Sequence, residues 1–517
     1  MAEETGRRRW RRWAVLLVIV ALAVFMYWPT RESIRISPQT TVVDGPLNAD
    51  GTVNYVAAMD RAWAEGVTPE NNAAILLLQA LGPEILPQAT REKVSATLGV
   101  SFDPNGGEYY VTWDGWLKAH RPAATQPQTQ PGEEATSEPA MPMSLADVLE
   151  MLQAGQDVPE IREWLEDNKQ PLDLIVAATQ RPRYYVPLVS ASSPPQVISL
   201  QLPALSCCRD VARALAARAE LEARAGQVEA AWQDLLAAHR LARLIEQGPT
   251  LIEQLVALAI ERTASDAGRT IATRGECTSE QARGLLAELV KLPPVGDVVG
   301  SIDRGERFML LDCVTVICRG GEMEGLYTAP ARWLNPDFNT VLTVCNDYYD
   351  RTVQAARTES PVARGKVSDA VWQSIDAELE RRKPSSIARL LLLTAGGRIT
   401  RQARSRELAR LLLHFFLPSL TKAVDFQDAT RMATEIEKLA LALAAYRGGH
   451  GRWPDRLEQL VPDYLPAIPP DRFADAPLIY RPGEKGYLLY SVGFNQRDDG
   501  GVDDYVEGRD DIVAEVK

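Results

Sequence analysis

Residues 219–238 read AELEARAGQVEAAWQDLLAA, and this stretch decides the fold class. A single glycine, Gly226, separates two runs that are rich in alanine and leucine. Apolar side chains recur at helical spacing in both runs, among them Leu221, Trp232 and Leu235. A tight α-hairpin favours glycine at its turn and alanine where the helices cross. The stretch therefore predicts two antiparallel helices.

The same pattern continues on both sides of this hairpin. Helices are predicted over residues 208–225, 228–246 and 250–270, with Gly248-Pro249 as the second break. Ser144 is a candidate helix cap further upstream. The pattern stays mostly helical from about residue 144 to 425, so we expect a mainly α fold. Its central part, residues 144–404, is predicted to be a scaffold of antiparallel α-hairpins.

Within this region, residues 219–238 resemble one tetratricopeptide unit. Gly226 takes the place of the interhelix turn, and Ala230 and Ala238 take the places of the small packing residues. We find no 34-residue repeat elsewhere in the chain. The resemblance therefore implies an α-helical scaffold and nothing more specific.

An apolar run near the N-terminus predicts a membrane anchor. Residues 13–28 read WAVLLVIVALAVFMYW and follow five arginines at positions 7, 8, 9, 11 and 12. Sixteen helical residues reach roughly 24 Å, and the flanking tryptophans and arginines extend the span towards the headgroups. The basic flank places the N-terminus in the cytoplasm. We therefore expect a single-pass protein of the inner membrane, with most of the chain periplasmic or otherwise extracytoplasmic.

Two alternatives to the anchor remain open. A cleaved signal peptide needs small residues after its apolar stretch, whereas this stretch ends in the bulky sequence FMYWP, residues 25–29. The run could also be a buried core helix. The anchor is favoured over both.

Composition divides the chain into six predicted parts. These are a basic segment and anchor (1–28), an extended tether (29–50), a small α-rich unit (51–120), a disordered linker (121–143), the helical scaffold (144–404) and an α+β domain (405–517). The linker, RPAATQPQTQPGEEATSEPAMPM, has almost no side chain that a core could bury.

Charge and motif content exclude several functions. The net charge of −13 argues against nucleic acid as a partner. The four histidines form no HExxH motif or Cys/His cluster, and the chain has no GxSxG, Walker or GxGxxG motif. We therefore expect a protein that is not an enzyme. His239, beside Arg240 on an amphipathic helix, is expected on the surface or in a groove.

Four carboxylates support the alternative that the protein is an enzyme. Glu306 and Asp312 flank an apolar run, and Glu253 and Glu261 lie on one predicted helix. Two such groups meeting in a dry groove would form an acid–base pair, and the chain would then be a periplasmic carboxylate-dependent hydrolase. Solvated helix faces explain these four residues more simply.

The six cysteines form no CxxC pair. They lie at positions 207, 208, 277, 313, 318 and 345. We interpret them as small buried apolar side chains, although disulfides between distant positions remain open in an oxidising compartment.

The C-terminal part has a different pattern. An amphipathic helix is predicted over residues 428–446, and two short strands over 478–481 and 486–491, joined by a turn with Pro482-Gly483. An acidic, glycine-rich loop follows. This end of the chain is therefore predicted to be a small α+β domain.

This region resembles the globular domain of the major pseudopilin of type II secretion over about 100 residues. The residues that carry the resemblance are, in order, Tyr446, Gly451-Arg452-Trp453-Pro454, Leu457 and Leu460, Ile468-Pro469-Pro470-Asp471, Tyr490-Ser491-Val492-Gly493, Gly500-Gly501 and Asp511-Ile512. Pseudopilins carry their apolar helix at the N-terminus after a peptidase site. This chain has it internally, and its own N-terminus lacks that site. The resemblance therefore implies a pseudopilin-like module at the end of a helical body.

The resemblance also implies a structural calcium ion. The family's loop binds calcium, and the matching positions here are the Val492 carbonyl, Asn495 and Asp511. Asn495 stands where the family has an aspartate. Asp498 and Asp499, or Asp503, would supply further oxygens, since calcium accepts six to eight in loose geometry. A solvated acidic loop is the simpler alternative.

The N-terminal part also resembles bacterial membrane-anchored proteins of no assigned function. The matching segments are residues 50–55, DGTVNY, and residues 66–74, GVTPENNAA. Together these features predict a non-enzymatic envelope protein that binds another protein through its stacked hairpins, with a link to a secretion or pilus-like system.

Overall fold

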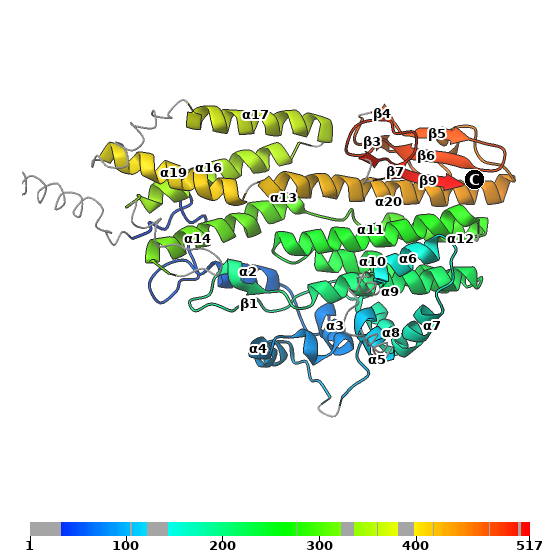
Figure 1. The fold of residues 1–517 in the computed structure, drawn as a ribbon, viewed down its shortest axis with the longest axis horizontal. Coiled ribbons are helices and arrows are strands. Elements are labelled where there is room, and N and C mark those ends of the chain that lie inside the picture. Colours follow the sequence, from blue (N-terminus) through cyan, green and yellow to red (C-terminus); the bar gives the residue numbers. More distant parts are fainter. Residues whose placement is uncertain are drawn as a thin grey trace, which may run out of the picture.

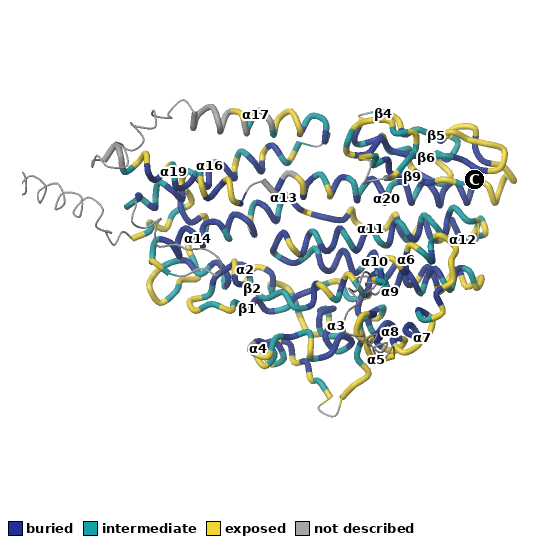
Figure 2. Tube along the Cα trace, viewed as in Figure 1, coloured by how far each residue is buried: buried dark blue, intermediate teal, exposed yellow. Residues whose placement is uncertain are grey.

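The computed structural model describes residues 33–103, 106–120, 143–275, 277–321, 335–358, 360–380, 398–416, 418–474, 476–504 and 508–516. Within them the protein is mainly helical, as predicted, with a few small sheets. Figure 1 shows an elongated molecule in which one long helix, α20, runs parallel to the long axis. Buried residues follow the helices along its centre, and exposed residues lie mostly on outer helices and loops (Figure 2).

The predicted hairpins form at the centre of the molecule. Helices α9 (Leu205–Arg224), α10 (Val228–Ile245) and α11 (Leu251–Arg274) pack on one another, and their bounds are close to the predicted ones. Gly226, between α9 and α10, has φ +78°, a backbone conformation that strains any residue with a side chain. Thr250 and Glu253 form a capping box that starts α11.

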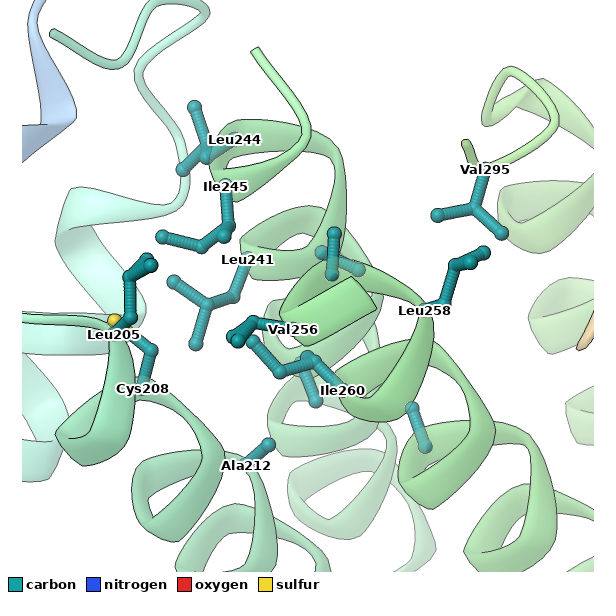
Figure 3. Close-up of a cluster of buried hydrophobic side chains, with 14 of the residues drawn as sticks. Leu205, Cys208, Ala212, Leu241, Leu244, Ile245, Val256, Leu258, Ile260 and Val295 are labelled. Carbon is teal, nitrogen blue, oxygen red and sulfur yellow. The ribbon is translucent and has the colours of Figure 1, made fainter. Parts of the chain in front are cut away.

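A continuous apolar core fills the space between these helices. Figure 3 shows side chains of α9, α10 and α11 in contact around Leu241 and Ile260, both without exposed surface. Helix α10 is buried on nearly all of its faces. A helix enclosed on every side must also bury its polar residues.

Helix α20 (Pro418–His450) runs along the long axis of the molecule. It packs on α11 and on α12 (Ser279–Lys291), and its predicted apolar stripe, which includes Ile436, Leu439 and Leu443, is buried there. The helix is longer than the predicted one, which covered residues 428–446. It begins after α19 (Arg398–Phe416) and continues through Gly448 and Gly449.

A group of shorter helices covers α9 and α10 on the side away from α20 (Figure 1). Helix α3 packs on α8, and α6 packs on α9. The buried side chain of Asn72, at the start of α3, holds the segment around Tyr185 against this group. It donates to the Tyr185 carbonyl and accepts from the Tyr185 N–H. The helices are α2 (Tyr55–Ala64), α3 (Ala73–Leu81), η1 (Pro83–Ile85), α4 (Gln88–Leu98), α5 (Trp113–His120), α6 (Leu145–Gln153), α7 (Pro159–Asp167) and α8 (Lys169–Ala178).

At the opposite end of the long axis from the C-terminus, α14 packs on α16, which packs on α17 and α19. The bounds here are α13 (Val298–Ser301), η3 (Ile302–Glu306), α14 (Arg307–Arg319), α16 (Phe338–Ala356) and α17 (Pro361–Glu380). The predicted tether covers residues 29–50, of which the structure describes residues 33–50. These residues contain turns and lie against α16, where Asn346 donates to the carbonyls of Gln39 and Thr40 at 3.1 and 2.9 Å.

A three-stranded antiparallel sheet packs on α20 at the C-terminal end, in the order β5–β6–β9. Strands β5 (Ile479–Pro482) and β6 (Tyr487–Ser491) form the predicted hairpin, with Ile479 opposite Tyr490. The third strand, β9 (Ile512–Val516), was not predicted. The remaining pairs are short: β1 (Val189–Ser190) with β2 (Leu200–Gln201), β3 (Pro470–Asp471) with β4 (Ala476–Pro477), and β7 (Asp503–Asp504) with β8 (Arg509–Asp510). Two further single turns are η2 (Val197–Ser199) and η4 (Leu457–Leu460).

The predicted anchor, residues 13–28, and most of the predicted linker, residues 121–142, lie outside the described residues. Among the helices that the structure does describe, none has the length and apolar character needed to cross a membrane.

Candidate functional site

A groove of about 700 Å³ lies beside the α9–α10 hairpin. Helices α7 and α8 form one wall, and α9 and α10 form the other. Its lining mixes apolar side chains such as Leu165 and Leu221 with charged ones of both signs. A groove of this size and mixed polarity fits the range of ligand sites in proteins.

Arg218 organises the charges of this groove. It donates two hydrogen bonds of 2.6 Å to the Asp234 carboxylate and one of 2.9 Å to Asp173. The two bonds to Asp234 form a bidentate pair, the stronger form of an arginine–carboxylate contact. Arg218 thereby fixes α9 to α8 and α10 across the floor of the groove.

Glu222, one turn further along α9, is less well satisfied. Burial raises its pKa to about 7, and the neighbouring Asp234 charge adds to this effect. Its Oε2 atom is buried and has no hydrogen-bond partner among the described residues. Glu222 therefore offers the groove a polar group that an incoming ligand could satisfy.

A second cluster of charged side chains lies inside the scaffold, at the meeting point of α10, α11 and α20. His239 Nδ1 lies 2.9 Å from Glu261 Oε2, and His239 Nε2 lies 3.4 Å from Glu437 Oε1. Arg243 pairs with Glu261, and Thr434 donates to Glu261 at 3.0 Å. His239, Glu261 and Glu437 have no exposed surface. The expectation that His239 lies on the surface or in a groove is therefore wrong.

The charges in this cluster depend on one another. Burial alone would lower the pKa of His239, but the Glu261 and Glu437 carboxylates outweigh that effect and raise it to about 9. Burial would raise the pKa of Glu261, but His239 and Arg243 hold it well below its ordinary value. Burial raises the pKa of Glu437. The His239 ring thus lies between two glutamates in a fully buried site that favours its charged form.

The other carboxylates singled out in the sequence are also buried. Glu253 and Glu306 both have pKa values raised to about 7 by burial, and Asp312 has one raised to about 6. Glu253 caps α11, and Asp312 accepts from the Val197 N–H at 2.8 Å. The solvated helix faces that the sequence favoured for these residues are therefore not found. Their partners are mainly backbone and hydroxyl groups, which indicates a structural role.

A different carboxylate lines a pocket. Glu246, at the end of α10, accepts from the Gly296 N–H, and burial raises its pKa to about 7. It lies on the wall of a pocket of about 570 Å³ together with Gln254, Asp297 and Arg304. Sequence reasoning missed Glu246, because nothing in its local pattern distinguishes it from a helix-end glutamate.

The predicted calcium loop is held by a network of hydrogen bonds. Asp498 accepts from the Tyr490 hydroxyl at 2.8 Å and from the Gly500 N–H at 2.9 Å. The Asn495 amide donates to Asp499 Oδ2 at 2.7 Å, and its oxygen accepts from the Arg497 N–H at 2.7 Å. The Asn495 oxygen is thus already engaged by the backbone.

Asp511 is the member of the loop that best fits a cation ligand. Its Oδ2 accepts from the Gly501 and Val502 N–H groups, whereas its Oδ1 is buried without a hydrogen-bond partner in the described part of the chain. Burial raises the pKa of Asp511, and the nearby Asp499 charge raises it further. Val492 donates its own N–H to Asp471. Within the described residues, no three His, Cys, Asp or Glu side chains are grouped so as to hold a metal ion.

The six cysteines form no disulfide in the described structure, and their side chains are buried or partly buried. Cys208, Cys313 and Cys345 are buried, and Cys207, Cys277 and Cys318 are partly buried. Burial raises the pKa of Cys208 to about 12, which leaves that thiol unreactive.

No family model, curated protein or solved structure matches the chain. The pseudopilin and tetratricopeptide resemblances therefore stay predictions.

Proposed function

We propose that the protein is a membrane-anchored envelope protein that acts as an interaction scaffold and not as an enzyme. In this proposal residues 13–28 hold it in the inner membrane, and the described part lies in the periplasm. The pseudopilin-like C-terminal region links it to a secretion or pilus-like system. The observation that carries the proposal is the groove beside the α9–α10 hairpin.

The groove suits a peptide segment of another protein. It lies between two helical hairpins, and its lining combines apolar residues with charged residues of both signs. The free Oε2 of Glu222 provides a hydrogen-bonding position for a backbone N–H of the partner. Helical hairpins that stack in this way commonly bind peptides along such surfaces.

Site-specific crosslinking tests this proposal. A photoreactive amino acid at Ala230, which is exposed and lines the groove, should capture the same envelope protein in repeated experiments in cells. The same group at the exposed Lys291 on α12 serves as the control. Glu222→Arg should abolish capture from Ala230. Equal capture from both positions, or none from Ala230, would contradict the groove as the binding surface.

A second candidate is the periplasmic carboxylate-dependent hydrolase. It is favoured by one observation, namely that Glu246 has a raised pKa and shares a pocket wall with the exposed carboxylate of Asp297. A protonated and an ionised carboxyl group in one pocket provide an acid and a base. Fluorogenic esters, phosphates and glycosides should be hydrolysed by the wild type and not by Glu246→Gln. Activity that survives this substitution, or no activity, would exclude it.

A further inference from the structure

A third pocket, of about 690 Å³, lies where α17, α20 and β3 meet. Figure 1 shows α17 and the C-terminal strands on the same side of α20. The pocket is separate from the groove and from the acidic loop. Its charged lining residues are Arg357, Arg364, Arg431, Arg472, Asp297, Asp428 and Asp471.

One aspartate, Asp428, forms ion pairs with two of these arginines. Asp428 is buried, and its Oδ1 lies 2.8 Å from Arg472 Nη2, while its Oδ2 pairs with Arg364 Nη1. Asp428 therefore pairs with both arginines, and the Asp425 carboxyl group also lies near Arg364. The Nε–H of Arg472 is also buried and has no hydrogen-bond partner among the described residues.

Arg431, one turn further along α20 from Asp428, has no carboxylate of its own in the described structure. Its guanidinium donates to the carbonyls of Val295, at 2.8 Å, and Gly296. Burial lowers its pKa, and the positive charge of Arg472 lowers it further, although Asp428, Glu246 and Asp297 partly offset both effects. Arg431 and Arg472 are thus like charges that face one pocket without full compensation.

The other two aspartates of the lining are engaged elsewhere. Asp471 accepts from the N–H groups of Phe473 and Val492 and from the Ser491 hydroxyl. Asp297 caps α13 and lies 3.6 Å from Arg304, on the exposed side. Arg431 therefore has no carboxylate partner among the described residues, and Arg472 shares Asp428 with Arg364.

We propose that this pocket binds a phosphate group, held by Arg431 and Arg472. A guanidinium has five N–H donors, and Arg431 gives two of them to the Val295 and Gly296 carbonyls, so its remaining donors and those of Arg472 would bind the phosphate oxygens. A phosphate dianion would compensate the two positive charges. The N-terminus of α17, capped by Ser360, lies in the same wall and also favours a negative charge. The pocket has room for inorganic phosphate or for a small phosphomonoester. Bound phosphate would connect β3 to α20 independently of any partner in the groove.

Calorimetric titration of the full chain tests this proposal. Inorganic phosphate and glycerol 3-phosphate are the two ligands, and binding of either supports the site. Tighter binding of glycerol 3-phosphate would identify a phosphomonoester as the ligand, and tighter binding of inorganic phosphate would identify the free anion. Arg431→Gln and Arg472→Gln should each weaken binding at least tenfold. The control is Arg452→Gln, which removes an exposed arginine paired with Asp455 and should bind as the wild type does.

Two results would overturn the proposal. One is the absence of binding by either ligand to the wild type. The other is equal binding by the wild type and both glutamine variants, which would indicate a general salt effect. Should a glutamine variant fail to fold, Arg431→Lys and Arg472→Lys decide the question, because lysine keeps the charge but not the paired donors. Their affinity should then fall between those of the wild type and the glutamine variants.

Discussion

At the scale of single residues, the buried His239 cluster depends on a close approach at Gly268. This glycine lies on α11, and a Cβ atom built on it would lie 2.0 Å from Glu437 Oε1. Glu437 therefore occupies the space that a side chain would need, opposite His239. A glycine in the middle of a helix is otherwise unfavourable.

We predict that Gly268→Ala destabilises the protein by about 1–3 kcal/mol, because Glu437 must move out of its position beside His239. The matched control is Gly284→Ala on α12, where a new Cβ would meet nothing within 4 Å. That change should instead stabilise the protein by about 0.5–1 kcal/mol through helix propensity. Chemical denaturation measures both. A stabilising effect at both glycines would contradict the packing described here.

The burial of Glu306 leads to a prediction about how the stability of the folded protein depends on pH. Its pKa is raised from 4.5 to about 7 by burial, so the folded state holds its proton more tightly than the unfolded state does. The resulting stability is fully present below pH 4.5 and is lost as the pH rises through 7. The shift corresponds to about 3 kcal/mol.

Glu306→Gln should therefore be more stable than the wild type at pH 8 and lose most of that advantage at pH 5. Denaturation curves between these values measure the difference, with Glu84→Gln at an exposed position as the control. Parallel pH profiles for the wild type and Glu306→Gln would show that the carboxyl group is ionised in the folded state.

At the scale of elements, the calcium prediction concerns the acidic loop between β6 and β9. Its strands pair in register, with Ser491 opposite Ile512, and Asp511 directly precedes β9. The free Oδ1 of Asp511 would become a ligand if calcium entered the loop. Calcium would then offset the repulsion between Asp511 and Asp499.

We predict that calcium raises the melting temperature of the wild type by several degrees and that Asp511→Asn removes this effect. An asparagine can still accept from the Gly501 and Val502 N–H groups, so the variant should match the wild type in the presence of a chelator. Differential scanning calorimetry with calcium and with EDTA distinguishes these cases. If the wild type melts at the same temperature in both, the loop needs no metal.

The elements also show what the sequence could predict and what it could not. The α9–α10–α11 hairpins were predicted because Gly226 and Gly248-Pro249 interrupt strong helical patterns, and these are local signals. Strand β9 was missed because its partner, β6, is separated from it by the acidic loop. His239 of α10 was placed on the surface or in a groove, since a local pattern does not reveal that a helix is enclosed on all sides.

At the scale of the whole molecule, the sequence could not predict the buried cluster of His239, Glu261 and Glu437, because local patterns do not show which helices meet. His239 and Glu437 lie on helices that are far apart in the chain, and the packing of both α10 and α20 on α11 brings them together. The groove was predicted in outline, as a surface of stacked hairpins. Its polar centre at Arg218 and the pocket at Arg431 were not predicted, because each combines residues from several distant segments.

Helix α20 also determines how the C-terminal region can behave. Its apolar residues pack on α11 and α12, while β9 packs on α20. We predict that residues 405–517 alone do not fold cooperatively, because Ile436, Leu439 and Glu437 would lose their partners. Thermal unfolding followed by circular dichroism should show a broad transition for this fragment and a sharp one for the full chain. A sharp transition for the fragment would identify an independent domain.

The length and position of α20 have a mechanical consequence. Its 33 residues make a rod of about 50 Å. Residues 33–43 are fastened to α16 at one end of the molecule, and the C-terminal sheet lies at the other end (Figure 1). A force applied to residues 33–43 would be transmitted through Asn346 to α16, and then through α19 to α20. The helix would then act as a rigid rod that holds the C-terminal sheet at a fixed distance from residues 33–43.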